Sequence, residues 1–215
     1  MMNKNESLVD PNLSREMSES ALEQSQDRGD LFEQSKLAQL MIARRTIHHF
    51  EPTEVPLEPV KRALELAVYA PNHHHTHPYR FYLMGEEIKS RFLEYAKEAF
   101  SERDPASAET KLARWKRIPG WILVTRKKSD KEKVAHEDYA TLSIALYMMM
   151  LSLTAEGIGT KWSTGSLLFN DEVYKIFGLN PQEEAIEGLF WYGYPEKRPL
   201  PFPKPQFDQY VTELK

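Results

Sequence analysis

Four histidines stand within five positions between two prolines in the stretch "YAPNHHHTHPYRF", residues 69–81. The whole chain has 7 histidines, so more than half of them lie in this loop. Imidazole ligates metals and transfers protons near neutral pH. His73 and His77 are four positions apart, a spacing that would place both rings on one face of a helix for a metal. Pro71 and Pro78 disfavour a helix, and the loop itself has no Cys, Asp or Glu. The pattern therefore favours contact with a planar polar ligand and leaves a metal site as the alternative.

A second candidate is "ARRTIHHF", residues 43–50, where two arginines and a hydroxyl follow a predicted helix. Guanidinium groups give bidentate, charge-assisted hydrogen bonds to phosphate. Arg44, Arg45 and Thr46 could therefore hold a phosphate group. Arginines at a helix C-terminus also stabilise the helix dipole, and this pattern alone leaves that purely structural role open.

The third candidate is "GTKWSTG", residues 159–165. Small residues around Trp162 let backbone N–H groups approach a ligand closely. An ordinary turn with a core tryptophan is the alternative.

Taken in order along the chain, these motifs resemble the nitroreductase family of FMN-dependent oxidoreductases. An Arg-Arg-Thr start, a helix ending in Ala-Pro, a Gly-x-Gly-Thr-x-Trp segment after a long helix and a terminal Gly-Tyr-Pro all occur here. The resemblance covers about residues 36–205 and is closest to the branch with Pro-[Asp/Asn]-His, here Pro71-Asn72-His73. It implies an α+β nitroreductase-like fold, with a central mixed or antiparallel sheet flanked by helices. It also implies an intertwined homodimer with FMN at the interface.

The resemblance assigns the FMN phosphate and ribityl chain to Arg44, Arg45 and Thr46. A basic residue near the C-terminus usually completes this phosphate site in the family, and Lys197 is the first choice. The alternatives are Arg198 and Lys204.

The flavin ring is assigned to three further segments by the same resemblance. His48 stands where the family often has Arg or Lys at the pyrimidine edge, so it would supply a positive charge only when protonated. The loop of the partner subunit would contribute Pro71, Asn72, His73 and His75, with His74 expected to face solvent. The edge of the isoalloxazine would lie along Trp162, Ser163, Thr164 and Gly165, with the Thr164 N–H directed at N5.

The implied activity is hydride transfer from NADH or NADPH, through flavin N5, to small electron-poor acceptors such as nitroaromatics, quinones or enones. No side chain is expected to be an obligatory catalytic acid or base. Two alternatives remain at this point. One is a protein of the same fold that stores or carries flavin, and the other is a metalloprotein built on the histidine loop.

Composition excludes several other classes of protein. The net charge of −4 gives no basic surplus for nucleic acid, and the absence of cysteine excludes disulfides, thiolate metal sites and cysteine nucleophiles. The apolar stretch 140–155 is short for a bilayer span and predicts a buried helix rather than a membrane segment. The polar start of the chain has no secretory signal pattern, so we expect a cytoplasmic protein.

The order of predicted elements indicates one α+β domain at residues 36–205. It follows an acidic extension, residues 1–35, that is predicted to be disordered, and a tail at 206–215 comes after it. The helices are expected at 31–45, 55–70, 86–103, 107–117, 134–156 and 170–179. The strands are expected at 79–85, 121–127 and 185–195, with a short strand or turn at 159–165.

Overall fold

The computed structural model describes residues 36–200 and 202–215. The chain divides into two compact units, one formed by Ala43–Arg198 and the other by Met1–Ile42 with Pro199–Lys215. In the described part of the second unit, the helical elements are α2 (Lys36–Ala43), whose last residue belongs to the first unit, and the 3-10 helix η2 (Phe207–Tyr210). The predicted acidic extension lies outside the described residues.

A four-stranded antiparallel sheet forms the centre of the unit Ala43–Arg198, in the order β1-β2-β4-β3. Its strands are β1 (Tyr79–Leu83), β2 (Gly120–Lys127), β3 (Gly159–Ser163) and β4 (Glu184–Gly193). The two central strands, β2 and β4, contain the apolar runs "WILV" and "LFWY". Strands β1 and β3 are therefore the edges of the sheet.

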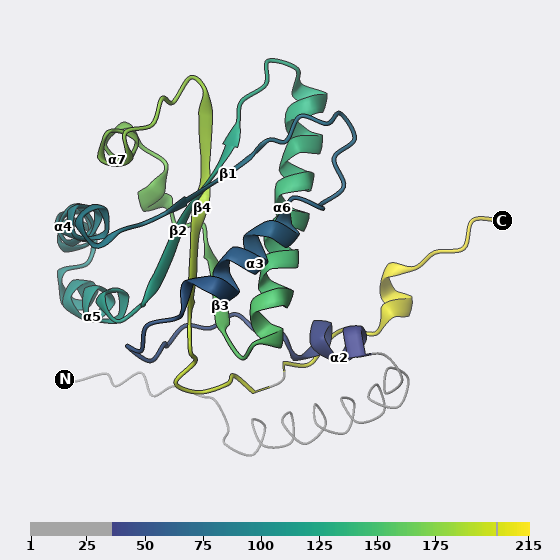
Figure 1. Ribbon diagram of the computed structural model, residues 1–215, viewed down its shortest axis with the longest axis horizontal. Coiled ribbons are helices and arrows are strands. Elements are labelled where there is room, and N and C mark those ends of the chain that lie inside the picture. The colour runs from purple at the N-terminus through teal and green to yellow at the C-terminus, as the bar shows by residue number, and fades with distance from the viewer. Residues whose placement is uncertain (1–35, 201) are drawn as a thin grey trace, which may run out of the picture. The chain divides into compact units, whose positions relative to one another are not determined.

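Helices cover both faces of this sheet, as Figure 1 shows. On one face lie α4 (Glu86–Arg103), α5 (Pro105–Lys116) and α7 (Asp171–Phe177), and on the other lie α3 (Leu57–Ala67) and α6 (Glu132–Ala155). The predicted α+β architecture, with an antiparallel sheet flanked by helices, is confirmed.

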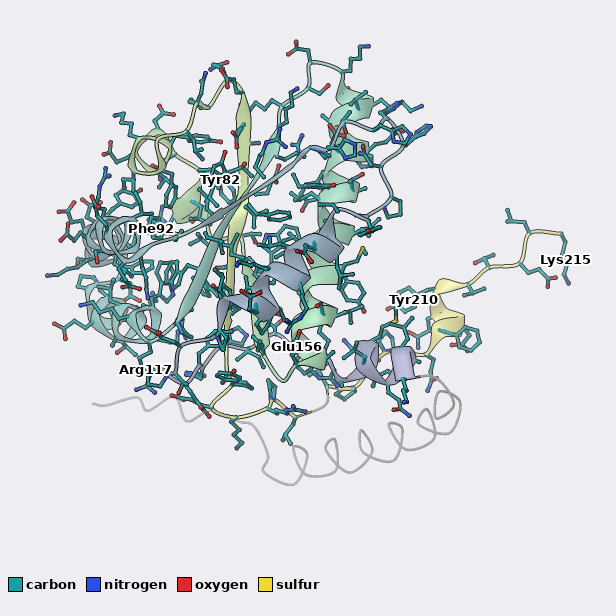
Figure 2. The ribbon with its side chains drawn as sticks, viewed as in Figure 1. Tyr82, Phe92, Arg117, Glu156, Tyr210 and Lys215 are labelled. Carbon is teal, nitrogen blue, oxygen red and sulfur yellow. The ribbon has the colours of Figure 1, made fainter. Side chains whose placement is uncertain are left out.

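Alternation along the central strands divides the apolar core into two clusters. In β2, Trp121 and Leu123 face the cluster under α4, α5 and α7, whereas Ile122 and Val124 face the cluster under α3 and α6. Successive side chains of a strand point to opposite faces of a sheet, so a strand covered on both faces is apolar at every position. Phe92 of α4, labelled in Figure 2, shows the packing on the first face. The centre of its ring lies 6.2 Å from that of the Trp121 ring.

Helix α6 is the one described helix that is long and apolar enough to cross a membrane by length and composition. Its buried residues, however, pack into the core against α3 and the sheet; they include Leu142, Ala145, Leu146, Met149 and Leu153. This burial explains its apolar character and agrees with the predicted core helix.

Some helix and strand boundaries in the structure differ from those expected from the sequence. Helix α5 begins at Pro105 rather than at residue 107, because proline is well suited to the first helical position, where its missing N–H has no helical partner. The segment at 159–165 is a true strand only as far as Ser163, and the 3-10 helix η1 (Ser166–Leu168) follows it. Of the helix expected at 31–45, the described part ends at Ala43.

Candidate functional site

The Arg-Arg-Thr segment runs beside edge strand β3. Thr46 forms a parallel bridge with Thr160, and the Ile47 N–H donates to the Thr160 carbonyl at 3.0 Å. The Ile47 side chain is buried in the core, which fixes this segment on the sheet. Arg44 and Arg45 are half-buried, whereas Thr46 is exposed. Two motifs that are more than 100 positions apart in the sequence are therefore adjacent in the fold.

The small-residue segment continues directly from β3. Trp162 and Ser163 are the last two residues of β3. Thr164 and Gly165 follow the last paired position of the strand and are exposed. The Trp162 indole N–H donates to the Glu187 carbonyl at 2.9 Å, which fixes the ring on β4. The predicted residues 162–165 thus leave the sheet edge next to the segment that contains Thr46.

A bulge in β4 creates the space for that tryptophan. The register between β2 and β4 shifts at Val124/Thr125, so that no residue of β2 lies opposite Glu187 in the strand pairing. The next residue, Gly188, has a φ of +142°, and a Cβ there would lie 2.6 Å from the indole nitrogen of Trp162. Only glycine allows this close approach at this backbone conformation.

Lys161 adds a positive charge that the sequence reasoning missed. Its Nζ lies 3.4 Å from Nδ1 of His48 and 4.9 Å from the centre of the Trp191 ring. Burial, and then the charge of Arg114, lower the pKa of Lys161. Among the described residues, no carboxylate forms a salt bridge with this half-buried amine. Lysine on an edge strand is usually a solvated residue, so its type alone gave no signal.

The surroundings of His48 favour its neutral form. Its pKa is lowered first by burial and then by the charges of Lys161, Arg114 and His49. In the tautomer that leaves Nδ1 unprotonated, the Lys161 ammonium donates a hydrogen bond to His48. Lys161, whose ordinary pKa is far above that of histidine, is therefore the better candidate for a positive charge at this position.

Lys197 follows two residues, Pro195 and Glu196, whose backbone pairs with that of the segment after Arg44 and Arg45. Phe50 pairs with Pro195, and the Glu196 N–H donates to the His49 carbonyl at 3.2 Å. Glu196 also forms a salt bridge with Arg117, at the end of α5 labelled in Figure 2. Lys197 and Arg198 are both exposed, and Lys204 belongs to the other compact unit.

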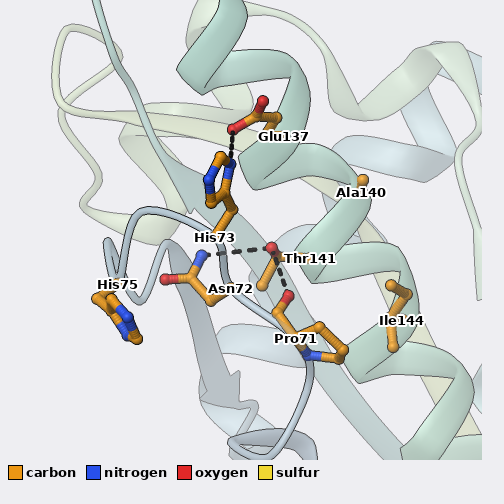
Figure 3. A pocket seen from close by; sticks show the side chains of 8 residues that line it. All are labelled: Pro71, Asn72, His73, His75, Glu137, Ala140, Thr141 and Ile144. Carbon is orange, nitrogen blue, oxygen red and sulfur yellow. Dashed lines mark hydrogen bonds and ion pairs between the residues drawn. The ribbon is translucent and has the colours of Figure 1, made fainter.

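The histidine loop lies on α6, as Figure 3 shows. The Thr141 hydroxyl donates to the Pro71 carbonyl at 2.9 Å and accepts from the Asn72 amide at 3.3 Å. Thr76 donates to Asp138 of the same helix. Loop and helix together form an open pocket of 530 Å³. The residues that line this pocket are Pro71, Asn72, His73, His75, Glu137, Ala140, Thr141 and Ile144. The predicted loop residues 71, 72, 73 and 75 thus share one pocket.

Glu137 is the second residue that the sequence reasoning missed. Its Oε2 lies 3.2 Å from Nδ1 of His73 and 2.7 Å from Nε2 of His74. His74 was expected to be simply solvated. It is exposed, with its side chain 37% accessible, but it also pairs with Glu137, as does His73, whose side chain is 71% exposed. Glu137 belongs to α6 and lies 64 positions from His73 in the sequence. No motif around the histidine loop could therefore predict this contact.

The predicted residues therefore gather in two places within one chain. Residues 46–48 lie beside residues 160–161 at the β3 edge, and residues 195–196, which precede Lys197, pair with residues 49–50, whereas residues 71–75 lie on α6. In the described structure, no hydrogen bond or ion pair joins the histidine loop to residues 44–48.

Comparison with known proteins gives the family. The model of the nitroreductase family matches residues 41–194. The chain is 32% identical over 174 residues to the Bacillus subtilis protein named "Putative NAD(P)H nitroreductase YfhC", covering 79% of this chain and 89% of that protein.

Solved structures show the same fold. A nitroreductase-like family protein from Bacillus cereus has a TM-score of 0.77 at 22% identity, over 84% of this chain and 97% of that one. The FMN-dependent nitroreductase NfnB from Mycobacterium smegmatis, solved in complex with NADPH, has a TM-score of 0.68 at 17% identity, over 84% and 99% of the two chains. By its sequence motifs, its fold and the match of the family model, the chain belongs to the nitroreductase family.

Proposed function

We propose that this protein is an FMN-dependent oxidoreductase that uses NADH or NADPH to reduce small electron-poor molecules. The observation that carries the proposal is the pairing of Thr46 and Ile47 with β3, which brings the arginine segment beside the strand that leads into exposed Thr164 and Gly165. Membership of the nitroreductase family and the naming of its relatives support the same activity.

The charge distribution of the β3 edge fits an anionic cofactor. Arg44 and Arg45 stand at the end of α2, and Lys161 is half-buried with no salt bridge to a described carboxylate. A buried charge is costly without a compensating one, so an anion bound here would relieve the cost. FMN would provide both a phosphate and a ring that becomes negatively charged on reduction.

Each segment then has a defined part in holding the cofactor. Arg44, Arg45 and Thr46 would bind the phosphate and ribityl chain, with Lys197 as the further cation. Lys161 and His48 would face the pyrimidine edge of the ring, and the backbone N–H of Thr164 would donate to flavin N5. When bound, FMN supplies the hydride-accepting and hydride-donating chemistry, and the protein supplies binding, orientation and electrostatics.

We also propose that a second copy of the chain covers the pocket on α6. Tyr139, Ile144 and Tyr147 on that helix are 38–42% exposed, and Leu66 and Val68 at the end of α3 are 44% and 54% exposed. Ile144 lines the pocket, and exposed apolar side chains on neighbouring elements are typical of a binding surface. The histidine loop would then contribute His73 and His75 to the cofactor held by the partner. Sedimentation of the protein with and without FMN tests this arrangement.

A flavin carrier without reductase activity is the second candidate. The lowered pKa of His48 favours it, because a neutral histidine there does not stabilise a negatively charged reduced ring. Lys161 beside it favours the reductase instead.

Flavin content tests the proposal directly. The purified protein is denatured, and the released chromophore is identified by chromatography against FMN, FAD and riboflavin standards. We expect about one FMN per subunit, as for a tightly held cofactor. Protein that contains no flavin and takes up none when FMN is added would refute the proposal.

A further inference from the structure

Two imidazoles and one carboxylate converge at the surface of α6. Nδ1 of His73, Nε2 of His74 and a carboxylate oxygen of Glu137 all lie within 4.8 Å of one another. The two histidine rings are stacked with their centres 4.5 Å apart, so both turn toward the same acid. Figure 3 shows the His73 ring directed at Glu137. Nothing in the proposed flavin chemistry uses Glu137 or His74.

We infer that these three side chains bind a divalent metal ion of the zinc class. Two histidines and one glutamate with an open fourth position form one of the ligand sets that zinc adopts in proteins. Imidazole ligands favour zinc, nickel or copper over magnesium and calcium, which prefer oxygen ligands alone. The open position would be filled by water or by a molecule in the adjoining pocket.

The distances between ligand atoms suit such an ion. In a tetrahedral site with bonds of about 2.1 Å, neighbouring ligand atoms lie about 3.4 Å apart. Oε2 of Glu137 lies 3.2 Å from the nitrogen of His73 and 2.7 Å from that of His74. Small side-chain rotations would therefore place an ion between them. Lys133 is 3.9 Å from the other carboxylate oxygen, Oε1, which leaves Oε2 to the histidines.

The loop that carries the histidines is already held in place. The side chain of Asn72 donates to Thr76 at 3.1 Å and accepts from the His77 N–H at 3.2 Å. With the bonds from Thr141 to Pro71 and from Thr76 to Asp138, these contacts fix the loop on α6. Ligands held by such outer contacts lose less conformational entropy on binding a metal, which strengthens the site.

The metal would add a further connection between the loop and α6, beside those at Thr141 and Asp138. Of the three ligands, His73 is also part of the proposed flavin contact, whereas His74 and Glu137 are not, so zinc binding by the His74 and Glu137 variants tests the metal site separately from the flavin function. Binding of Nδ1 of His73 to the metal also leaves the other ring nitrogen available for another contact.

Zinc binding to the full-length, untagged protein tests the site. Protein freed of metal with a chelator is dialysed against graded Zn²⁺, and the bound metal is measured by elemental analysis. We expect about one zinc ion per subunit. Loss of an outer-shell partner costs about 10–100-fold in metal affinity, so His73→Ala, His74→Ala and Glu137→Gln should each weaken binding by at least about tenfold.

His136→Ala is the matched control, because His136 is exposed on α6 beside Glu137 and belongs to no ligand set. It should bind zinc as the wild type does. Circular dichroism of each variant establishes that the fold is retained. The inference is overturned if the wild type binds no stoichiometric zinc, if Glu137→Gln binds as tightly as the wild type, or if His136→Ala weakens binding as much as His74→Ala.

Discussion

Arg45 is the residue on which the phosphate assignment depends most. It is half-buried and immediately precedes Thr46, which pairs with β3, so it adjoins the segment that is proposed to hold the phosphate. Arg45→Ala should weaken FMN binding by about 1.5–3 kcal/mol, the scale of a hydrogen bond to a charged group. Titration of the apoprotein with FMN measures the change. Arg91→Ala, at an exposed position on α4, is the control, and equal affinities of the two variants would contradict the assignment.

His73 and His74 separate flavin contact from metal contact. His73→Ala should lower FMN affinity by about 0.5–1.5 kcal/mol, the contribution of one neutral hydrogen bond, whereas His74→Ala should change it little. Both variants should lose zinc. Flavin occupancy of the two purified variants, with and without chelator, measures the difference. A chelator that removes flavin, or a His74→Ala variant as depleted of flavin as His73→Ala, would contradict the separation.

Single residues were predictable from the sequence only where they belong to a local motif. The arginine pair and the Trp162 segment each form a short, distinctive string, and the structure places both at one sheet edge. Lys161 and Glu137 had no such context. Their contacts with His48 and His73 connect positions 113 and 64 residues apart, and only the folded chain creates them.

At the scale of elements, the bulge in β4 positions the proposed flavin-binding segment. Gly188→Ala would place a methyl group 2.6 Å from the Trp162 indole nitrogen and 2.7 Å from the Ser163 carbonyl, at a φ that other residues rarely adopt. We expect a loss of about 1–3 kcal/mol in the free energy of unfolding from the backbone strain, together with lower flavin content.

Gly85→Ala is the control for that change, since a methyl group at Gly85 would have no other atom within 4 Å and Gly85 has no positive φ. Urea unfolding and flavin content of both variants make the comparison. If Gly188→Ala matches Gly85→Ala in both measurements, then the bulge does not position Trp162.

Elements with strong apolar patterning were the ones that the sequence predicted well. The buried run in β2 appears where it was expected, because a strand covered on both faces must be apolar, and the apolar run in α6 appears because one side of this helix packs into the core. Strand β3 was ambiguous since Gly159, Thr160 and Ser163 are small or polar. Its pairing with β4 and with Thr46, rather than its own composition, makes it a strand.

At the scale of the whole molecule, the family match covers residues 41–194 and leaves out the acidic N-terminal segment. Deletion of residues 1–30 should therefore leave flavin content and reductase rate nearly unchanged, because that segment is poor in apolar residues and outside the resemblance. The truncated and full-length proteins are compared for bound FMN and NADPH oxidation. A soluble truncated protein without flavin would show that the segment supports the fold.

The central claim is that this protein binds FMN and reduces it with a nicotinamide cofactor. The most direct test is the visible absorbance spectrum of the purified, FMN-saturated protein under anaerobic conditions, recorded before and after addition of NADH or NADPH. We predict the spectrum of an oxidised protein-bound flavin, bleached by at least one of the two donors and restored by a quinone or nitroaromatic acceptor. A bound flavin that neither donor bleaches, or a protein that binds no flavin, would contradict the account.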